Sequence, residues 1–111
     1  MTIQEFFDAL KETRRAGYQP YITIKSSRQV IRLTSPTGGE HCPITAVCEH
    51  RTGQTYPPMT VYSIMEQLGL DPDDAYVIAA AADGDVNSAP LVRQQLLRAL
   101  APLVSVPRDE R

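Results

Sequence analysis

The sequence has no tryptophan, only two cysteines and two histidines, and no long apolar run. Its longest apolar run covers residues 77–82 and is far shorter than the roughly 20 residues that a membrane-spanning helix needs. A secreted domain of this size usually carries more cysteines, and the polar, acidic residues 1–5 are unlike a signal peptide. We therefore expect a cytoplasmic protein that makes no contact with membranes.

A strong excess of either charge is also lacking, because 13 acidic residues nearly balance 11 basic ones. The net charge of −2 argues against a dominant electrostatic attraction to nucleic acid, which is therefore not the expected partner. The charge is uneven along the chain, since residues 1–56 have a net charge of +2 and residues 57–111 one of −4. The two halves could complement each other within one fold. They could also complement a protein partner or a second copy of the chain in a homodimer.

Periodicity and capping residues predict an α+β fold: one small, mostly helical domain over residues 1–104, followed by a flexible tail over residues 105–111. A chain of 111 residues has room for one core. The first helix has a capping-box pattern, because Thr2 can accept from a backbone N–H and Glu5 can reach back. About five helices are expected, over residues 2–16, 43–50, 59–68, 71–82 and 87–101.

One antiparallel β-hairpin is predicted near residues 21–34. Apolar and polar residues alternate over 21–25 and again over 30–34, and the polar residues 26–29 suggest a loop slightly longer than the tightest class. The buried face is expected to hold the apolar members of both strands, Ile22, Ile24, Ile31 and Leu33. The helices must cover this face, because two strands alone are marginally stable in water.

The residue types best suited to metal binding gather in one short stretch that holds His41, Cys42, Cys48 and His50. These are ligand types for tetrahedral zinc, but structural zinc sites usually pair their ligands two to four residues apart. On a helix, the separation between the two cysteines would be about 9 Å along the axis, too far for one ion to bind both. We therefore expect no metal or other cofactor, with Cys48 as a small core residue.

A second interpretation takes Cys42 alone as a reactive thiol. It precedes the predicted helix that begins at Pro43, and a helix N-terminus favours the thiolate, as would a protonated His41 nearby. A thiol-dependent enzyme or redox sensor also needs a base within hydrogen-bond reach and an oxyanion site, which sequence adjacency does not provide. The alternative is that Cys42 caps the helix or fills the core. We therefore favour a binding protein over an enzyme.

Two charged surfaces are the candidate binding sites. An acidic surface is expected around the predicted helix over 71–82, and its members are Asp71, Asp73, Asp74, Asp83 and Asp85. A basic surface is expected on the outer face of the hairpin, and its members are Lys25, Arg28 and Arg32. Basic residues on an exposed sheet can bind single-stranded nucleic acid, but they also protect a sheet edge from aggregation, and we favour the second role.

The sequence contains no assignable Ser/His/Asp set, no glycine-rich phosphate loop and no pair of catalytic carboxylates. The glycine-containing junction over residues 37–43, followed by compact helices, resembles small bacterial or phage accessory proteins. We therefore expect a small, non-enzymatic protein-binding module that acts on a partner protein or as a homodimer. Thiol chemistry at Cys42 and weak nucleic-acid binding through the hairpin are the alternatives.

Overall fold

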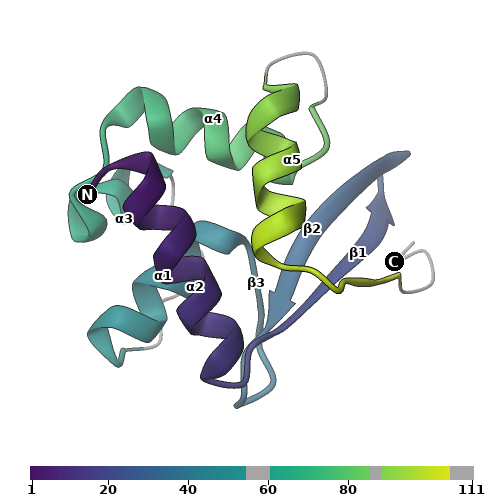
Figure 1. Cartoon of the computed structure of the whole chain (residues 1–111), viewed down its shortest axis with the longest axis horizontal. Helices are drawn as coiled ribbons and strands as arrows, with labels where there is room; N and C mark the ends of the chain where they lie inside the picture. The colour runs from purple at the N-terminus through teal and green to yellow at the C-terminus, as the bar shows by residue number, and fades with distance from the viewer. Residues whose placement is uncertain (55–60, 86–88, 106–111) are drawn as a thin grey trace.

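The predicted α+β class is confirmed by the computed structural model, which describes residues 1–54, 61–85 and 89–105. Within these ranges the chain forms five helices and one four-stranded sheet. In chain order the elements are α1 (Ile3–Arg15), β1 (Gln19–Lys25), β2 (Arg28–Thr34), β3 (Glu40–His41), α2 (Pro43–Thr52), α3 (Val61–Leu68), α4 (Pro72–Ala82), α5 (Pro90–Ala99) and β4 (Val104–Ser105). Figure 1 shows the helices gathered on one side, with the β1–β2 hairpin projecting to their right.

The first helix begins where the capping box predicts. Glu5 N donates to Thr2 Oγ1 (3.1 Å) and Thr2 N donates to Glu5 Oε1 (2.9 Å). These hydrogen bonds with Thr2 lower the pKa of the Glu5 carboxyl. The side of α1 that faces the core carries Phe6, Phe7, Ala9, Leu10 and Thr13. The rest of the helix surface faces solvent and presents most of its charged residues.

The hairpin is confirmed, but its connection is tighter than the sequence predicts. Ser26 and Ser27 alone join β1 to β2, and Lys25 pairs with Arg28. Both serines have positive φ, 51° and 64°, as the central residues of a two-residue type I′ turn do. The predicted loop was too long because Asn-Gly or Asp-Gly, rather than two serines, is the usual signal for such a turn.

One face of the hairpin packs against helices. Ile31 and Leu33 are fully buried, as predicted, and α2 and α4 both contact β2. Ile24 lies near the free end of the hairpin and stays 36% exposed. On the opposite face, Thr23 and Val30 pair across the strands and are also buried. Both faces of the hairpin are therefore covered in part.

Two short strands complete the sheet, whose order is β3-β2-β1-β4. β3 pairs antiparallel with the end of β2, and β4 pairs parallel with β1, where Tyr21 lies opposite Val104. Ser105, the first residue of the predicted tail, therefore belongs to the sheet. The rest of that tail, residues 106–111, and the predicted helix starts at residues 59 and 87–88 lie outside the described residues.

The helices enclose one core together with the inner face of the hairpin. The largest fully buried side chains include Phe6, Leu10, Ile31, Leu33, Ile44, Ile78, Leu96 and Leu100. α4 contributes mainly alanines, whose small side chains allow close contact with α3 and α5. α1 and α5 also contact each other and run along the same side of the molecule (Figure 1). In the described part of the chain, no helix has the length and apolar character needed to cross a membrane.

Candidate functional site

The cysteines and histidines of residues 41–50 do not form a metal-binding group with the other described residues. Cys42 is the N-cap of α2, where its Sγ accepts a hydrogen bond from Thr45 N (3.5 Å) and lies 3.2 Å from Thr45 Oγ1. Cys48 is fully buried in the core. Cys42 therefore has the structural role of a helix cap, which was one of the two roles expected from the sequence.

The two histidines instead lie around a buried carboxylate in α2. Glu49 is 8% exposed, and its Oε1 accepts a hydrogen bond from Tyr18 Oη (3.0 Å). Its Oε2 lies 3.2 Å from His41 Nε2, in an orientation that makes no hydrogen bond. His50 packs edge-on against the Tyr18 ring, with 6.3 Å between ring centroids. Burial and the Glu49 carboxylate raise the pKa of Tyr18 to about 12, so the phenol keeps its proton. The contacts of Glu49 with Tyr18 and His41 connect α2 with the α1–β1 connection and with β3.

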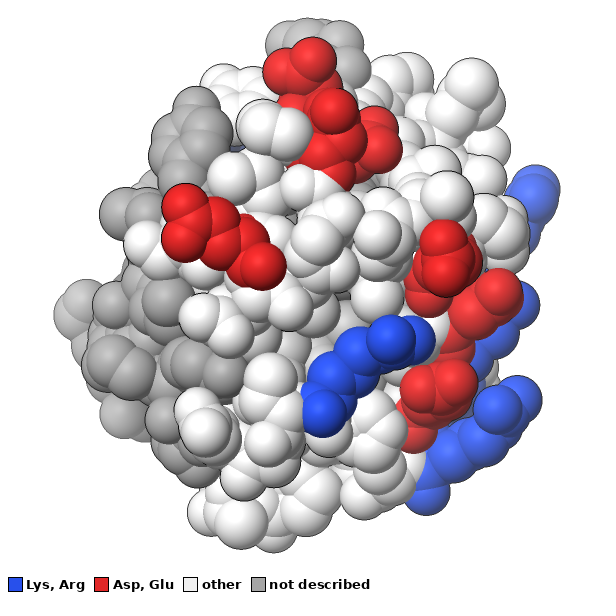
Figure 2. All heavy atoms as spheres, turned by 90° about the vertical axis from the view of Figure 1, so that its left-hand side faces the viewer, with Lys and Arg blue, Asp and Glu red and all other residues white. Residues whose placement is uncertain are grey.

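The predicted acidic residues occupy two places rather than one. Asp71 caps α4 by accepting a hydrogen bond from Asp73 N (2.9 Å), and Asp74 follows in the first turn. Asp83 lies at the other end of this helix of 11 residues, about 16 Å away, and is paired with Arg32. On the face shown in Figure 2, the acidic side chains fall into separate groups. The predicted acidic surface is therefore not continuous.

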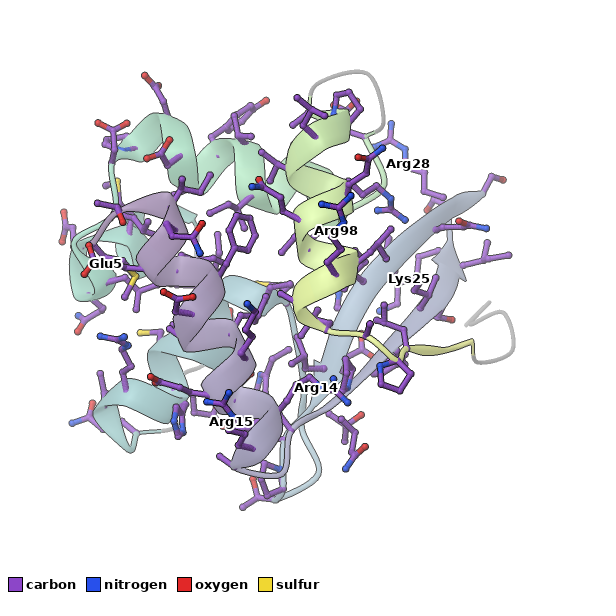
Figure 3. All side chains as sticks on the ribbon, in the orientation of Figure 1. Glu5, Arg14, Arg15, Lys25, Arg28 and Arg98 are labelled. Carbon is purple, nitrogen blue, oxygen red and sulfur yellow. The ribbon has the colours of Figure 1, made fainter. Side chains whose placement is uncertain are left out.

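Carboxylates neutralise two of the three basic residues predicted on the hairpin. Lys25 Nζ lies 2.5 Å from Glu40 Oε1. Arg32 Nη2 lies 2.9 Å from Asp83 Oδ1, and Arg32 Nε lies 3.8 Å from Glu40 Oε1. Burial acts to raise the pKa of Glu40, but hydrogen bonds from Lys25 and Tyr21 outweigh it, and the pKa is lowered. Figure 3 shows Lys25 on the hairpin, well apart from α1.

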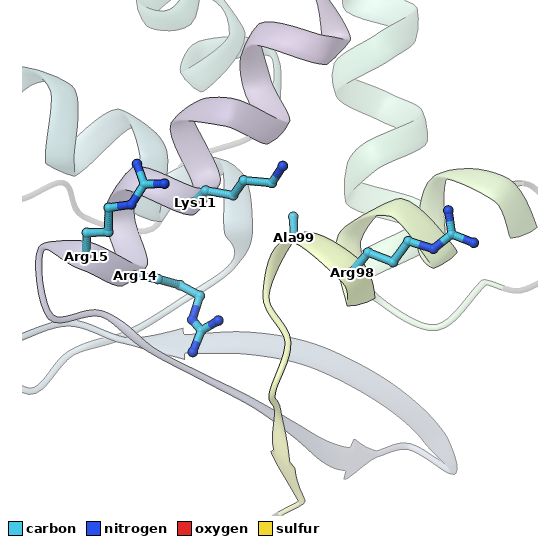
Figure 4. A pocket seen from close by; sticks show the side chains of 5 residues that line it. All are labelled: Lys11, Arg14, Arg15, Arg98 and Ala99. Atoms are coloured by element: carbon cyan, nitrogen blue, oxygen red, sulfur yellow. The ribbon is translucent and has the colours of Figure 1, made fainter.

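An open groove between α1 and α5 gathers basic side chains that the sequence analysis did not single out. Its larger part is a hollow of about 390 Å³ (Figure 4), lined by Lys11, Arg14, Arg15, Arg98 and Ala99. A neighbouring hollow of about 190 Å³ is lined by Gln4, Phe7, Lys11, Gln95, Arg98 and Ala99. Because the two hollows share three residues, we treat them as one site, the α1–α5 groove.

Helical spacing explains why α1 supplies three of the four cations. Arg14 and Arg15 follow Lys11 by three and four residues, so each of them neighbours Lys11 on the helix surface. Contact between α1 and α5 places Arg98 at the rim of the same hollow. Ala99 leaves room for the hollow because its side chain is a single methyl group, and Figure 4 shows Lys11 extending from α1 toward it.

The cations of the α1–α5 groove are not neutralised within the described residues. There, Lys11, Arg15 and Arg98 form no ion pair with any carboxylate. Arg14 donates from Nη1 to the carbonyl oxygen of Ala101, which satisfies a donor but leaves the charge without a counterion. Basic side chains around a concave surface concentrate positive potential there and can bind an anion through charge-assisted hydrogen bonds.

Part of the signal for this groove is present in the sequence. The spacing of Lys11, Arg14 and Arg15 predicts a basic side of the first helix, but only the tertiary structure shows that Arg98 lines the same hollow. Compared with known proteins, the chain matches no family model, no curated protein and no solved structure. The functional argument therefore depends on the chemistry of the groove.

Proposed function

We propose that the protein is a non-enzymatic binding module that captures an anionic segment of a partner in the α1–α5 groove. The observation that carries this proposal is the set of four basic side chains around one hollow, with no carboxylate paired to them among the described residues. Like charges held close together repel one another and oppose folding. An anion bound in the groove relieves this repulsion, so its binding is favoured by the charges that the fold brings together.

The geometry around Cys42 supports a binding function over thiol chemistry. Its hydrogen bonds within the described residues run to Thr45, and the neighbouring His41 has its Nε2 beside Glu49. A nucleophilic cysteine needs a base within hydrogen-bond reach to take up its proton. A side chain that caps a helix and has no histidine as hydrogen-bond partner favours a structural role for the sulfur.

The test uses a fluorescein-labelled peptide of eight glutamates, titrated with the full chain and followed by fluorescence anisotropy. We expect saturable binding that weakens as salt is added, because salt screens exposed charges. The double variant Lys11→Glu/Arg98→Glu reverses two charges on opposite walls of the groove. It should weaken binding roughly tenfold or more, since each exposed charge contact contributes a modest share of the affinity.

The matched control is the double variant Arg28→Glu/Arg51→Glu. Both side chains are exposed, neither lines the groove, and the change in net charge is the same. Circular dichroism confirms that both variants are folded before binding is measured. If the control loses as much affinity as the groove variant, the peptide responds to net charge alone and the proposal is wrong.

A further inference from the structure

We infer that the anionic segment belongs to a protein and consists of a short, extended acidic run with a large apolar side chain beside it. This inference rests on the proposed function and adds the chemistry of the partner. Three features carry it: an exposed leucine in line with the groove, carboxylates that limit its cationic part, and a lining suited to a peptide backbone.

An apolar side chain continues the groove along α5. Leu91 is 72% exposed. It precedes Gln95 by four residues and Arg98 by seven, so the three share one side of the helix. A single exposed leucine is ordinary on a protein surface. This one lies in line with two residues that line the groove, so a partner held by the cations has an apolar contact within reach.

Carboxylates limit the cationic part of α1. Glu5, Asp8 and Glu12 are exposed on the same helix. Gln4 Nε2 donates to Asp8 Oδ1 (3.3 Å), which places a carboxylate beside the end of the groove that Gln4 lines. A long polyanion such as a nucleic-acid strand would meet these carboxylates after passing the cations, and would be repelled. A short acidic run avoids them.

The smaller hollow, where Gln4, Phe7 and Gln95 join Lys11 and Arg98, has a lining that suits a peptide. Phe7, the aromatic residue that contributes to this lining, is only 4% exposed and offers no ring face for bases. Binding of single strands without base recognition combines phosphate contacts with stacking on aromatic rings. Gln4 and Gln95 carry amides that both donate and accept hydrogen bonds, as a peptide backbone requires.

Helix geometry sets the spacing expected in the partner. Seven residues separate Leu91 from Arg98, which is about 10 Å along α5. An extended chain advances about 3.3 Å per residue, so the apolar residue lies about three positions from the nearest carboxylate. Charged and amide groups line the groove together with Phe7 and Ala99, and this mixed lining differs from the hydrophobic groove that the apolar face of a helix requires.

The experiment compares labelled peptides on the full chain by fluorescence anisotropy. The first probe has four glutamates, a Gly-Ser spacer and a leucine, and a second probe has the same sequence reversed. In matched probes a serine replaces the leucine, and an oligothymidylate with the same number of charges represents single-stranded nucleic acid. We expect one leucine probe to bind about tenfold more tightly than its serine counterpart, and both to bind more tightly than the DNA.

Two variants assign the effect to Leu91. Leu91→Ser should remove the difference between the leucine and serine probes while leaving the affinity for the serine probe unchanged. Tyr76→Ser is the control, because Tyr76 is a large side chain that is 61% exposed and does not line the groove. It should preserve the difference. Both positions are exposed, so neither change is expected to disturb the fold.

The outcomes separate this inference from the proposed function. Equal affinity for leucine and serine probes overturns the apolar contact while the anionic site stands. A difference that survives Leu91→Ser overturns the assignment to Leu91. DNA that binds more tightly than every peptide overturns the protein partner. If neither peptides nor DNA bind, the proposed function itself is wrong.

Discussion

The hairpin and the α1–α5 groove each present a group of basic side chains, but the two groups differ in their surroundings. On the hairpin, Lys25 is paired with Glu40 and Arg32 with Asp83. In the groove, the cations of α1 and Arg98 of α5 have no such partner among the described residues. Basic residues in a sequence therefore do not identify a binding site by themselves, because tertiary structure decides which of them stay unpaired.

The largest effect is expected from breaking the contact between the end of α4 and the hairpin, where Gly84 lies against β2. Gly84 has φ of +86°, and a Cβ there would lie 2.8 Å from Gln29 O and 3.1 Å from Arg28 Cβ. We expect Gly84→Ala to lower the free energy of unfolding by about 2–4 kcal/mol, through backbone strain and displacement of the strand. Calorimetry should show a fall of roughly 10 °C in the unfolding midpoint.

The control for this prediction is Gly53→Ala. Gly53 also has positive φ, +70°, but a Cβ there would meet nothing within 4 Å. The cost should be limited to backbone strain, about 1 kcal/mol. Equal losses in the two variants would show that the packing of Gly84 against the hairpin does not matter. Binding of the glutamate peptide should be unchanged in both variants at temperatures where they are folded.

Local signals in the sequence were enough to predict most of the elements. The capping box at Thr2 and the alternation of the hairpin strands identify α1, β1 and β2, because each depends on neighbouring residues. β3 and β4 were not predicted, since strands of two residues leave no pattern and form only when the rest of the sheet is in place.

The candidate site was predictable only in part, because local sequence patterns do not show which distant segments meet. The basic side of α1 is a local property, whereas the meeting of α1 with α5 is a property of the whole core. The pairing of Arg32 with Asp83 joins residues far apart in the chain, so the sequence could not show that a member of the acidic surface neutralises a member of the basic one. The acidic and basic surfaces predicted from composition therefore took no account of ion pairs between residues far apart in the chain.

The second prediction concerns a variant in which a basic residue of the hairpin loses its carboxylate partner and so resembles the cations of the groove. Glu40→Gln removes the carboxylate that contacts Lys25 and Arg32. When it is added to the double variant Lys11→Glu/Arg98→Glu, this change should raise the affinity for the glutamate peptide roughly threefold above that of the double variant, because Lys25 loses its carboxylate partner. Glu66→Gln, which removes an exposed carboxylate outside both regions, is the control and should restore less. Equal recovery would mean that net charge, not pairing, distinguishes the two regions.

The third prediction concerns stability in acid. Partial desolvation acts to raise the pKa of Glu40, but hydrogen bonds from Lys25 and Tyr21 lower it below 4.5. The carboxylate therefore stabilises the fold above pH 4.5, and this contribution is lost as the pH falls through the lowered pKa. Thermal unfolding of the wild type should approach that of Glu40→Gln as the pH falls below 4.5, with a gap at neutral pH of less than about 1 kcal/mol. A gap that stays constant with pH contradicts the role given to Glu40.

The smallest effect is expected within the groove itself, at Arg14. Its Nη1 already donates to the Ala101 carbonyl, so an incoming carboxylate must share or displace that hydrogen bond. Arg98 has no ion pair among the described residues, and its guanidinium is free to turn toward an anion. We expect Arg14→Gln to weaken binding of the glutamate peptide less than about twofold and Arg98→Gln about fivefold, measured by anisotropy at one salt concentration. The opposite ranking would mean that a guanidinium fixed by a backbone carbonyl binds the anion better than a free one, and that preorganisation, not the absence of a partner, makes this region a site.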